Sequence, residues 1–108
     1  MTHRTQLSQP EEALRRADAA PANLRTLMER IAAWISFENS DAAITPADLD
    51  YFANHQAWAY LKRASRLGSV DNDRREALRA ALIAAMPAPR GETRGEYALR
   101  LRAAARAS

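Results

Sequence analysis

The chain has 108 residues, of which 47% are hydrophobic and 27% charged, and its formal net charge is +3. This length and composition predict one folded domain with a single core and exclude extensive disorder. Cysteine is absent, which excludes disulfides and thiolate metal sites. The N-terminal residues lack the apolar segment of a secretory signal, and the longest apolar run, residues 80–86, is far shorter than the roughly 20 residues of a membrane helix. We therefore expect a cytoplasmic protein that does not associate with membranes.

Alanine dominates the apolar residues. It supplies 25 positions, against one valine and four isoleucines. Alanine is the strongest helix former, whereas β-branched residues favour sheets. The sequence therefore predicts an all-α fold: a single-domain bundle of four to five helices, with a long central helix over about 46–67 and a basic C-terminal helix.

Local signals place the first two helices. Ser8 and Glu11 have the spacing of a capping box with a proline between them, which predicts a helix from there to about Ala19. Pro21 then opens a second helix that runs to about Glu38. The large apolar residues of this second helix recur every three or four positions and form one stripe: Leu24, Leu27, Met28, Ile31, Trp34 and Ile35.

The long central helix has signals at both ends. Thr45 is a natural N-cap, Pro46 occupies the first helical position, and Asp48 lies where the helix dipole favours negative charge. Gly68 can take the left-handed conformation that follows a helix C-terminus. We therefore expect the helix to continue to Leu67, a length of roughly 33 Å.

Two further helices follow. Asp71 or Asp73 caps a fourth helix that ends before Pro87, and Thr93 caps a last helix in which Glu96 completes a second capping box. Prolines and a glycine separate these two helices and indicate a connector that partly uncouples the last one. The expected parts of the single domain are a helical bundle over 1–86, a connector over 87–92 and a basic C-terminal helix over 93–108.

The apolar stripes of these helices predict the core. Its expected members are Leu24, Leu27, Ile31, Trp34, Ile35, Leu49, Leu61, Leu78 and Leu82. Stripes rich in alanine bury little apolar area per residue, so a monomeric bundle of this size would gain little stability from its core. We therefore expect self-association, as a dimer.

The sequence lacks the residues that common catalytic and cofactor sites require. Phosphate-binding loops need clustered glycines after a strand, and this chain has three dispersed glycines. Zinc needs three or four ligands, whereas His3 and His55 are the only histidines, and the acidic residues lack the spacing of a calcium loop. A Ser-His-Asp arrangement would have to use His55 with a serine that folding brings to it. We expect a protein that is not an enzyme and that needs no metal or cofactor.

A second stripe of the long helix, nearly opposite its apolar one, carries large aromatic residues. Its members are Tyr51, His55, Trp58 and Lys62. One interpretation is that the helix is central and that its neighbours cover it on both sides, with His55 as a hydrogen-bonded packing residue. The other is that the stripe binds a partner, because tyrosine and tryptophan dominate interface energetics. The sequence leaves both interpretations open.

Charge is unevenly divided along the chain. Residues 1–59 carry five arginines and eight acidic residues, a balance of −3, whereas residues 60–108 carry eleven basic and five acidic residues, a balance of +6. Such segregation is typical of proteins that bind nucleic acid or another polyanion. A GC-rich genome would also encode this many arginines and alanines, so only their positions are informative. The arginines expected to contact phosphates or an acidic partner are Arg74, Arg75, Arg79, Arg94, Arg102 and Arg106.

Together these features predict a non-catalytic helical interaction module, an accessory or adaptor protein. It would bind a protein partner or itself through the aromatic stripe and the basic C-terminal arm. The alternative is a small DNA- or RNA-associated accessory protein, for example a phage or bacterial regulatory or DNA-packaging factor, whose basic C-terminal half contacts phosphates. No stretch of the chain resembles the motif of a known family.

Overall fold

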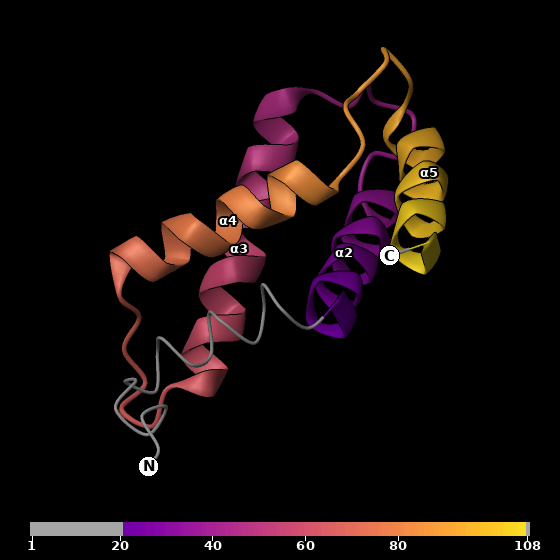
Figure 1. Cartoon of the computed structure of the whole chain (residues 1–108). Helices are drawn as coiled ribbons and strands as arrows, with labels where there is room; N and C mark the ends of the chain where they lie inside the picture. The colour runs from indigo at the N-terminus through magenta and orange to yellow at the C-terminus, as the bar shows by residue number, and fades with distance from the viewer. Residues whose placement is uncertain (1–20, 108) are drawn as a thin grey trace.

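Four helices form most of residues 21–107, the part of the chain that the structure, a computed structural model, describes (Figure 1). In chain order they are α2 (Pro21–Phe37), α3 (Pro46–Ala64), α4 (Asn72–Ala85) and α5 (Arg94–Ala107). Apart from one isolated bridge between Ala43 and Thr93, these residues contain no β-structure. The all-α prediction is confirmed, whereas the helix predicted over 8–19 lies outside the described residues.

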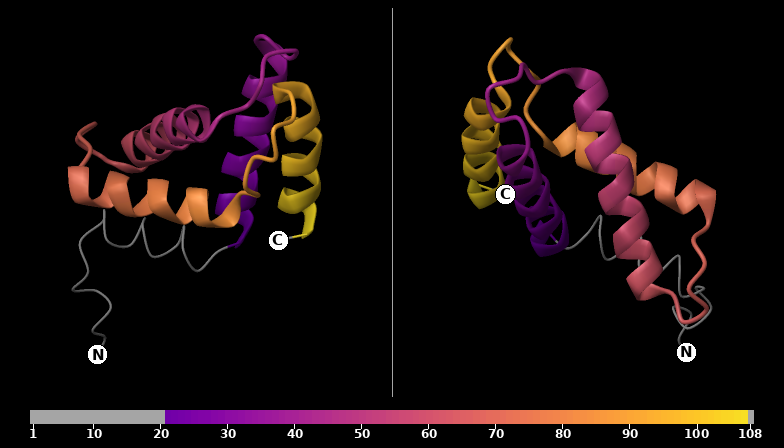
Figure 2. Two further views of the ribbon diagram at one scale, coloured as in Figure 1. Left: turned by 90° about the horizontal axis from the view of Figure 1, so that it is seen from above. Right: turned by 180° about the vertical axis from the view of Figure 1, so that it is seen from behind.

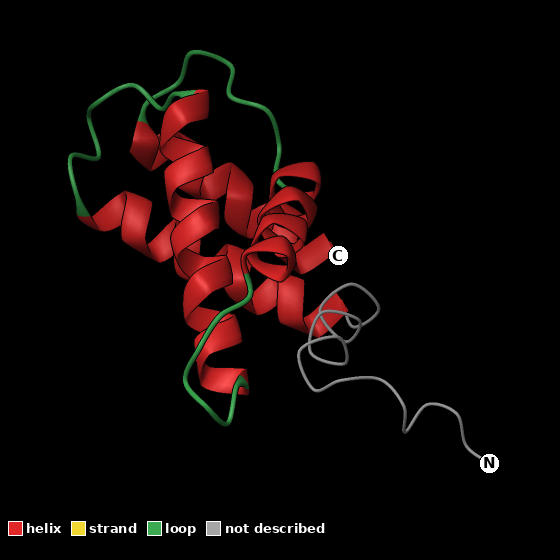
Figure 3. Cartoon of the chain, turned by 90° about the vertical axis from the view of Figure 1, so that its left-hand side faces the viewer, coloured by secondary structure: helices red, strands yellow, loops and turns green. Residues whose placement is uncertain are grey.

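The helices pack as two pairs. α2 lies antiparallel beside α5, and α4 crosses α3 obliquely (Figures 1 and 2). Contacts within each pair are more extensive than those that join α2 to α3 and α4. The connecting loops lie at the ends of the helices (Figure 3). α2 contacts both members of the crossed pair α3 and α4, and one side of α3 faces away from the core.

The predicted capping residues begin the helices. The Thr45 hydroxyl accepts from the Asp48 amide at 3.1 Å, and the Asp48 carboxylate accepts from the Thr45 amide at 3.1 Å. Asp71 accepts hydrogen bonds from two amides in the first turn of α4. Before α5, Thr93 and Glu96 exchange the same reciprocal pair, at 3.2 and 3.0 Å. These side chains satisfy amides that have no partner within the helix, which confirms the three predicted starts.

The C-terminal end of α3 differs from the prediction. The helix ends at Ala64 rather than Leu67, because Ser65 is extended (φ −90°, ψ 131°) and its hydroxyl accepts from the Leu67 amide at 3.3 Å. Serine offers the backbone such an alternative to helical bonding. Gly68 is left-handed (φ 73°), as expected, but its amide donates to the Ser65 carbonyl and closes a turn beyond the helix.

The core draws on all four helices. Seven of the nine residues predicted for it are buried, whereas Leu24 and Trp34 are only partly buried at its edge. Ile44, in the loop between α2 and α3, also joins the core and is 4% exposed. Other large buried residues are Met28, Phe52, Met86, Tyr97 and Leu101.

The last helix is an integral part of this core, which corrects the expectation of a partly uncoupled arm. Tyr97 and Leu101 are fully buried, and α5 packs along the length of α2. The connector is tied down as well: the Tyr97 hydroxyl donates to the Pro87 carbonyl at 2.6 Å, and the Arg100 guanidinium donates to the Ala88 carbonyl at 2.6 Å. The proline-rich connector therefore supplies acceptors for α5 and does not act as a loose hinge.

Candidate functional site

The four residues of the predicted aromatic stripe lie together on the outer side of α3 and are exposed. Tyr51 retains 58% of its surface exposed and Trp58 41%, and His55 and Lys62 are also exposed. The interpretation that neighbouring helices cover α3 on both sides is therefore wrong. α2 and α4 pack against its flanks, and this side of the helix stays open to solvent.

The aromatic rings of this surface contact one another in series. Trp34 of α2 meets Tyr51 with 6.0 Å between ring centroids and His55 with 4.8 Å, both edge to face. His55 in turn lies 6.2 Å from Trp58. Edge-to-face contact is favoured because the positive edge of one ring meets the negative face of the next. We call Trp34, Tyr51, His55, Trp58 and Lys62 the aromatic face.

Phe52 anchors the aromatic face to the core. It is 4% exposed, and its ring centroid lies 4.8 Å from that of Trp34 and 5.5 Å from that of Tyr51. The exposed rings are thus held by a buried one and by each other. Side chains that are already ordered lose little conformational entropy when a partner binds, so this surface is preorganised for contact.

One end of the aromatic face is basic. The Lys62 ammonium lies 4.8 Å from the centroid of the Trp58 ring, within the range of a cation–π interaction. Arg63 and Arg66 come next along the chain and are exposed. Neither arginine forms an ion pair with any residue that the structure describes. Positive charge that no described acidic residue pairs with therefore adjoins the Trp58 ring.

Sequence reasoning missed two residues of this region. Trp34 was assigned to the core, yet it is partly exposed and joins α2 to the rings of α3. Phe37 follows Trp34 by three positions near the end of α2 and is 86% exposed. The signal was available in the sequence: Phe37 is a large aromatic residue off the apolar stripe, next to the polar residues Ser36 and Glu38.

The arginines predicted on α4 are largely occupied within the protein. Arg79 binds Glu76 at 2.9 Å and also pairs with Asp50 of α3. The hydrogen bond between Arg79 and Glu76 holds the pKa of Glu76 below its usual value and raises the pKa of Arg79. Arg75 donates to the Asn54 side chain, also on α3. These two arginines therefore help to join α4 to α3.

The arginines predicted on α5 divide into two kinds. Arg94 pairs with Asp48 at the start of α3, with 3.0 Å between the charged groups. Arg102 and Arg106 form no ion pair with any described residue. Four of the six predicted arginines, Arg74, Arg75, Arg79 and Arg94, thus bind other side chains of the protein. Two acidic residues of the first half of the chain, Asp48 and Asp50, form ion pairs with arginines of the second half.

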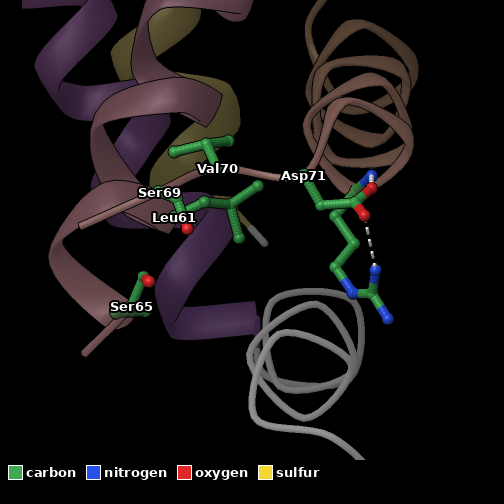
Figure 4. A pocket seen from close by; sticks show the side chains of 7 residues that line it. Leu61, Ser65, Ser69, Val70 and Asp71 are labelled. Atoms are coloured by element: carbon green, nitrogen blue, oxygen red, sulfur yellow. Dashed lines mark hydrogen bonds and ion pairs between the residues drawn. The ribbon is translucent and has the colours of Figure 1, made fainter. Parts of the chain in front are cut away.

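The smallest cavity described lies at the turn between α3 and α4 and does not provide a site. Its volume is about 20 Å³, which is room for about one water molecule. Figure 4 shows the side chains that line it. Arg74, on its border, pairs with Asp71 at 3.2 Å. The residues that line the cavity are Leu61, Ala64, Ser65, Ser69, Val70, Asp71 and Arg74.

The described residues offer little toward other kinds of site. Within 21–107, no three histidine, cysteine or acidic side chains are grouped so as to hold a metal ion. None of the described helices combines the length and the hydrophobicity that a bilayer span requires. Comparison with family models, with curated proteins and with solved structures gives no match to this chain.

Proposed function

We propose that this protein is a non-catalytic helical interaction module, an accessory or adaptor protein, whose aromatic face binds a segment of another protein. The observation that carries the proposal is the exposure of ordered rings that contact one another. Tyr51 and Trp58 are the large hydrophobic residues among them that are exposed. Exposed aromatic surface is unfavourable in water, and tyrosine and tryptophan are the residues that most often dominate binding energy at interfaces.

Charge indicates the chemistry of the partner. The rings offer contact area to apolar side chains, and Lys62, over the Trp58 ring, places positive charge at one end of the same surface. A segment that carries apolar side chains followed by acidic residues would complement both features. The nucleic-acid alternative has less support from the structure, because Arg75, Arg79 and Arg94 already bind groups of α3.

Site-directed photocrosslinking in the native host tests the proposal. A photoreactive phenylalanine analogue would replace His55 in one variant and Leu99, which is 66% exposed on α5, in a matched control. We expect one discrete protein adduct from position 55 and none from position 99. Adding Tyr51→Ala should abolish the adduct, because it removes a largely exposed ring that adjoins the probe.

Other outcomes would contradict the proposal in distinct ways. Equal labelling from positions 55 and 99 would mean that the aromatic face has no special affinity. An adduct whose mass is twice that of the chain would show that the occupant is a second copy. Crosslinks to nucleic acid alone would favour the alternative function.

A further inference from the structure

A groove of about 350 Å³ lies between α2 and the C-terminal half of α3. Its lining residues are Thr26, Leu27, Arg30, Tyr60, Arg63 and Ala64. Two of these six residues are arginines and none is acidic. Arg63 follows Lys62 directly in the chain, so the groove adjoins the basic end of the aromatic face. It is distinct from that face, because none of the residues named as its lining belongs to the aromatic face.

Among residues 21–107, the two arginines of the groove have no acidic partner. Neither Arg30 nor Arg63 forms an ion pair with a described residue, although arginines of α4 and α5 find acids nearby. Two like charges that line one groove repel each other, and the repulsion is stronger beside apolar groups than in open water. Leu27 is 1% exposed and supplies such an apolar floor. An anion bound between the two guanidinium groups would be attracted to both and would offset their mutual repulsion.

We infer that this groove is an anion-binding site and that it takes the carboxylates of an acidic peptide segment. The planar guanidinium presents paired donors that match the two oxygens of a carboxylate, and such charge-assisted bonds are among the strongest that side chains form. A phosphate backbone would require a longer track of available cations, and the arginines of α4 hold groups of the protein instead. The peptide origin of the anion rests on the proposed function, whereas the site itself does not use the aromatic rings.

The test is a titration of the full-length, ¹⁵N-labelled protein with hexaglutamate blocked at both ends, followed by NMR at low salt. We expect saturable shifts of the Arg30 and Arg63 side-chain Nε–H signals and of the backbone amides around them. An Arg30→Gln/Arg63→Gln double variant should bind the peptide about tenfold more weakly or worse, as the loss of two charge-assisted hydrogen bonds predicts. Both side chains are exposed, so the variant should keep the native spectrum elsewhere.

The matched control is Arg90→Gln/Arg106→Gln, which removes the same charge at two exposed positions outside the groove. It should change the affinity by no more than about twofold, the effect of a general change in charge. An equal loss in both double variants, or shifts spread over all the arginines, would overturn the inference. Tighter binding of a six-nucleotide oligothymidylate at Arg30 and Arg63 would overturn the assignment to a peptide.

Failure of this inference can be told apart from failure of the proposed function. Tyr51→Ala should leave hexaglutamate binding intact while it abolishes the crosslinked adduct. If the adduct forms but hexaglutamate does not bind, the groove inference alone is wrong. If hexaglutamate binds but no adduct forms from position 55, the proposed function fails and the anion site stands.

Discussion

A tyrosine is buried in one region of the molecule and exposed in another. The first region is the interface between α2 and α5, which we call the seam, and the second is the outer side of α3. In the seam, Tyr97 is fully buried, its hydroxyl donates to the Pro87 carbonyl, and Arg100 lies over its ring at 5.5 Å. On the outer side of α3, Tyr51 is more than half exposed and its ring meets Trp34 and Phe52 only edge on. The first tyrosine is part of the fold, and the second rests on it.

This difference shows where the chain uses aromatic surface for stability and where it does not. A buried ring contributes the free energy of removing it from water and, for tyrosine, a satisfied hydrogen bond. A ring that stays exposed contributes little of either. Substitutions in the seam should therefore act on folding, and substitutions on the aromatic face should act on binding.

The largest effect is expected from deleting residues 93–108. The deletion removes α5 with the fully buried Tyr97 and Leu101, and it uncovers the helix against which α5 packs most extensively, α2. The other described helices, α2, α3 and α4, would then lack a covered core. We expect cooperative unfolding to be lost, as measured by circular dichroism during a urea titration. A cooperative transition in the fragment would show instead that α5 is a dispensable arm.

A smaller but still large loss is expected for Ile31→Ala. Ile31 is fully buried, and truncation of such a residue usually costs roughly 2–5 kcal/mol of unfolding free energy, because it leaves a cavity. The matched control is Leu99→Ala on the exposed side of α5, which should change this free energy by less than about 0.5 kcal/mol. Urea denaturation of the two variants beside the parent protein measures both values. Equal losses would contradict the assignment of the core.

Tyr97 provides a test that depends on pH. Burial raises the pKa of Tyr97 to about 12, above its ordinary value of 10.0. The folded protein thus holds the phenolic proton more tightly than the unfolded chain does. The resulting stability is fully present below pH 10 and is lost as the pH rises from 10 to 12.

Tyr97→Phe should separate this contribution from others. At neutral pH it should lower the unfolding free energy by about 1 kcal/mol, the usual value of one hydrogen bond, since the bond to Pro87 is lost. Between pH 10 and 12 the variant should lose less stability than the parent protein. Parallel losses in both proteins would show that Tyr97 does not govern this range.

Much of the secondary structure could be predicted from the sequence because its determinants are local. Thr45, Asp71 and Thr93 begin their helices through hydrogen bonds to amides two or three residues away, and such spacing is visible in a sequence. The end of α3 could not be predicted in the same way. Two stop signals, Ser65 and Gly68, lie three residues apart, and the competition between them depends on how the turn to α4 packs.

The candidate site could be predicted only in part. The helical spacing brought Tyr51 and Trp58 to one side, but their exposure depends on where α2 and α4 pack. The pairing of the arginines could not be predicted at all, since Arg79 pairs with Asp50, which lies 29 residues away in the chain. A count of charge along the sequence cannot tell an arginine that holds another helix from one that is available to a ligand.

The most direct test of the central claim compares two adjacent residues, Phe52→Ala and Tyr51→Ala. Phe52 is 4% exposed and Tyr51 58%, although both rings contact Trp34. We predict that Phe52→Ala lowers the unfolding free energy by roughly 3–5 kcal/mol. Tyr51→Ala should lower it by less than about 1 kcal/mol while it abolishes the crosslinked adduct from position 55. A loss of stability from Tyr51→Ala as large as that from Phe52→Ala, or an adduct that survives it, would contradict the account.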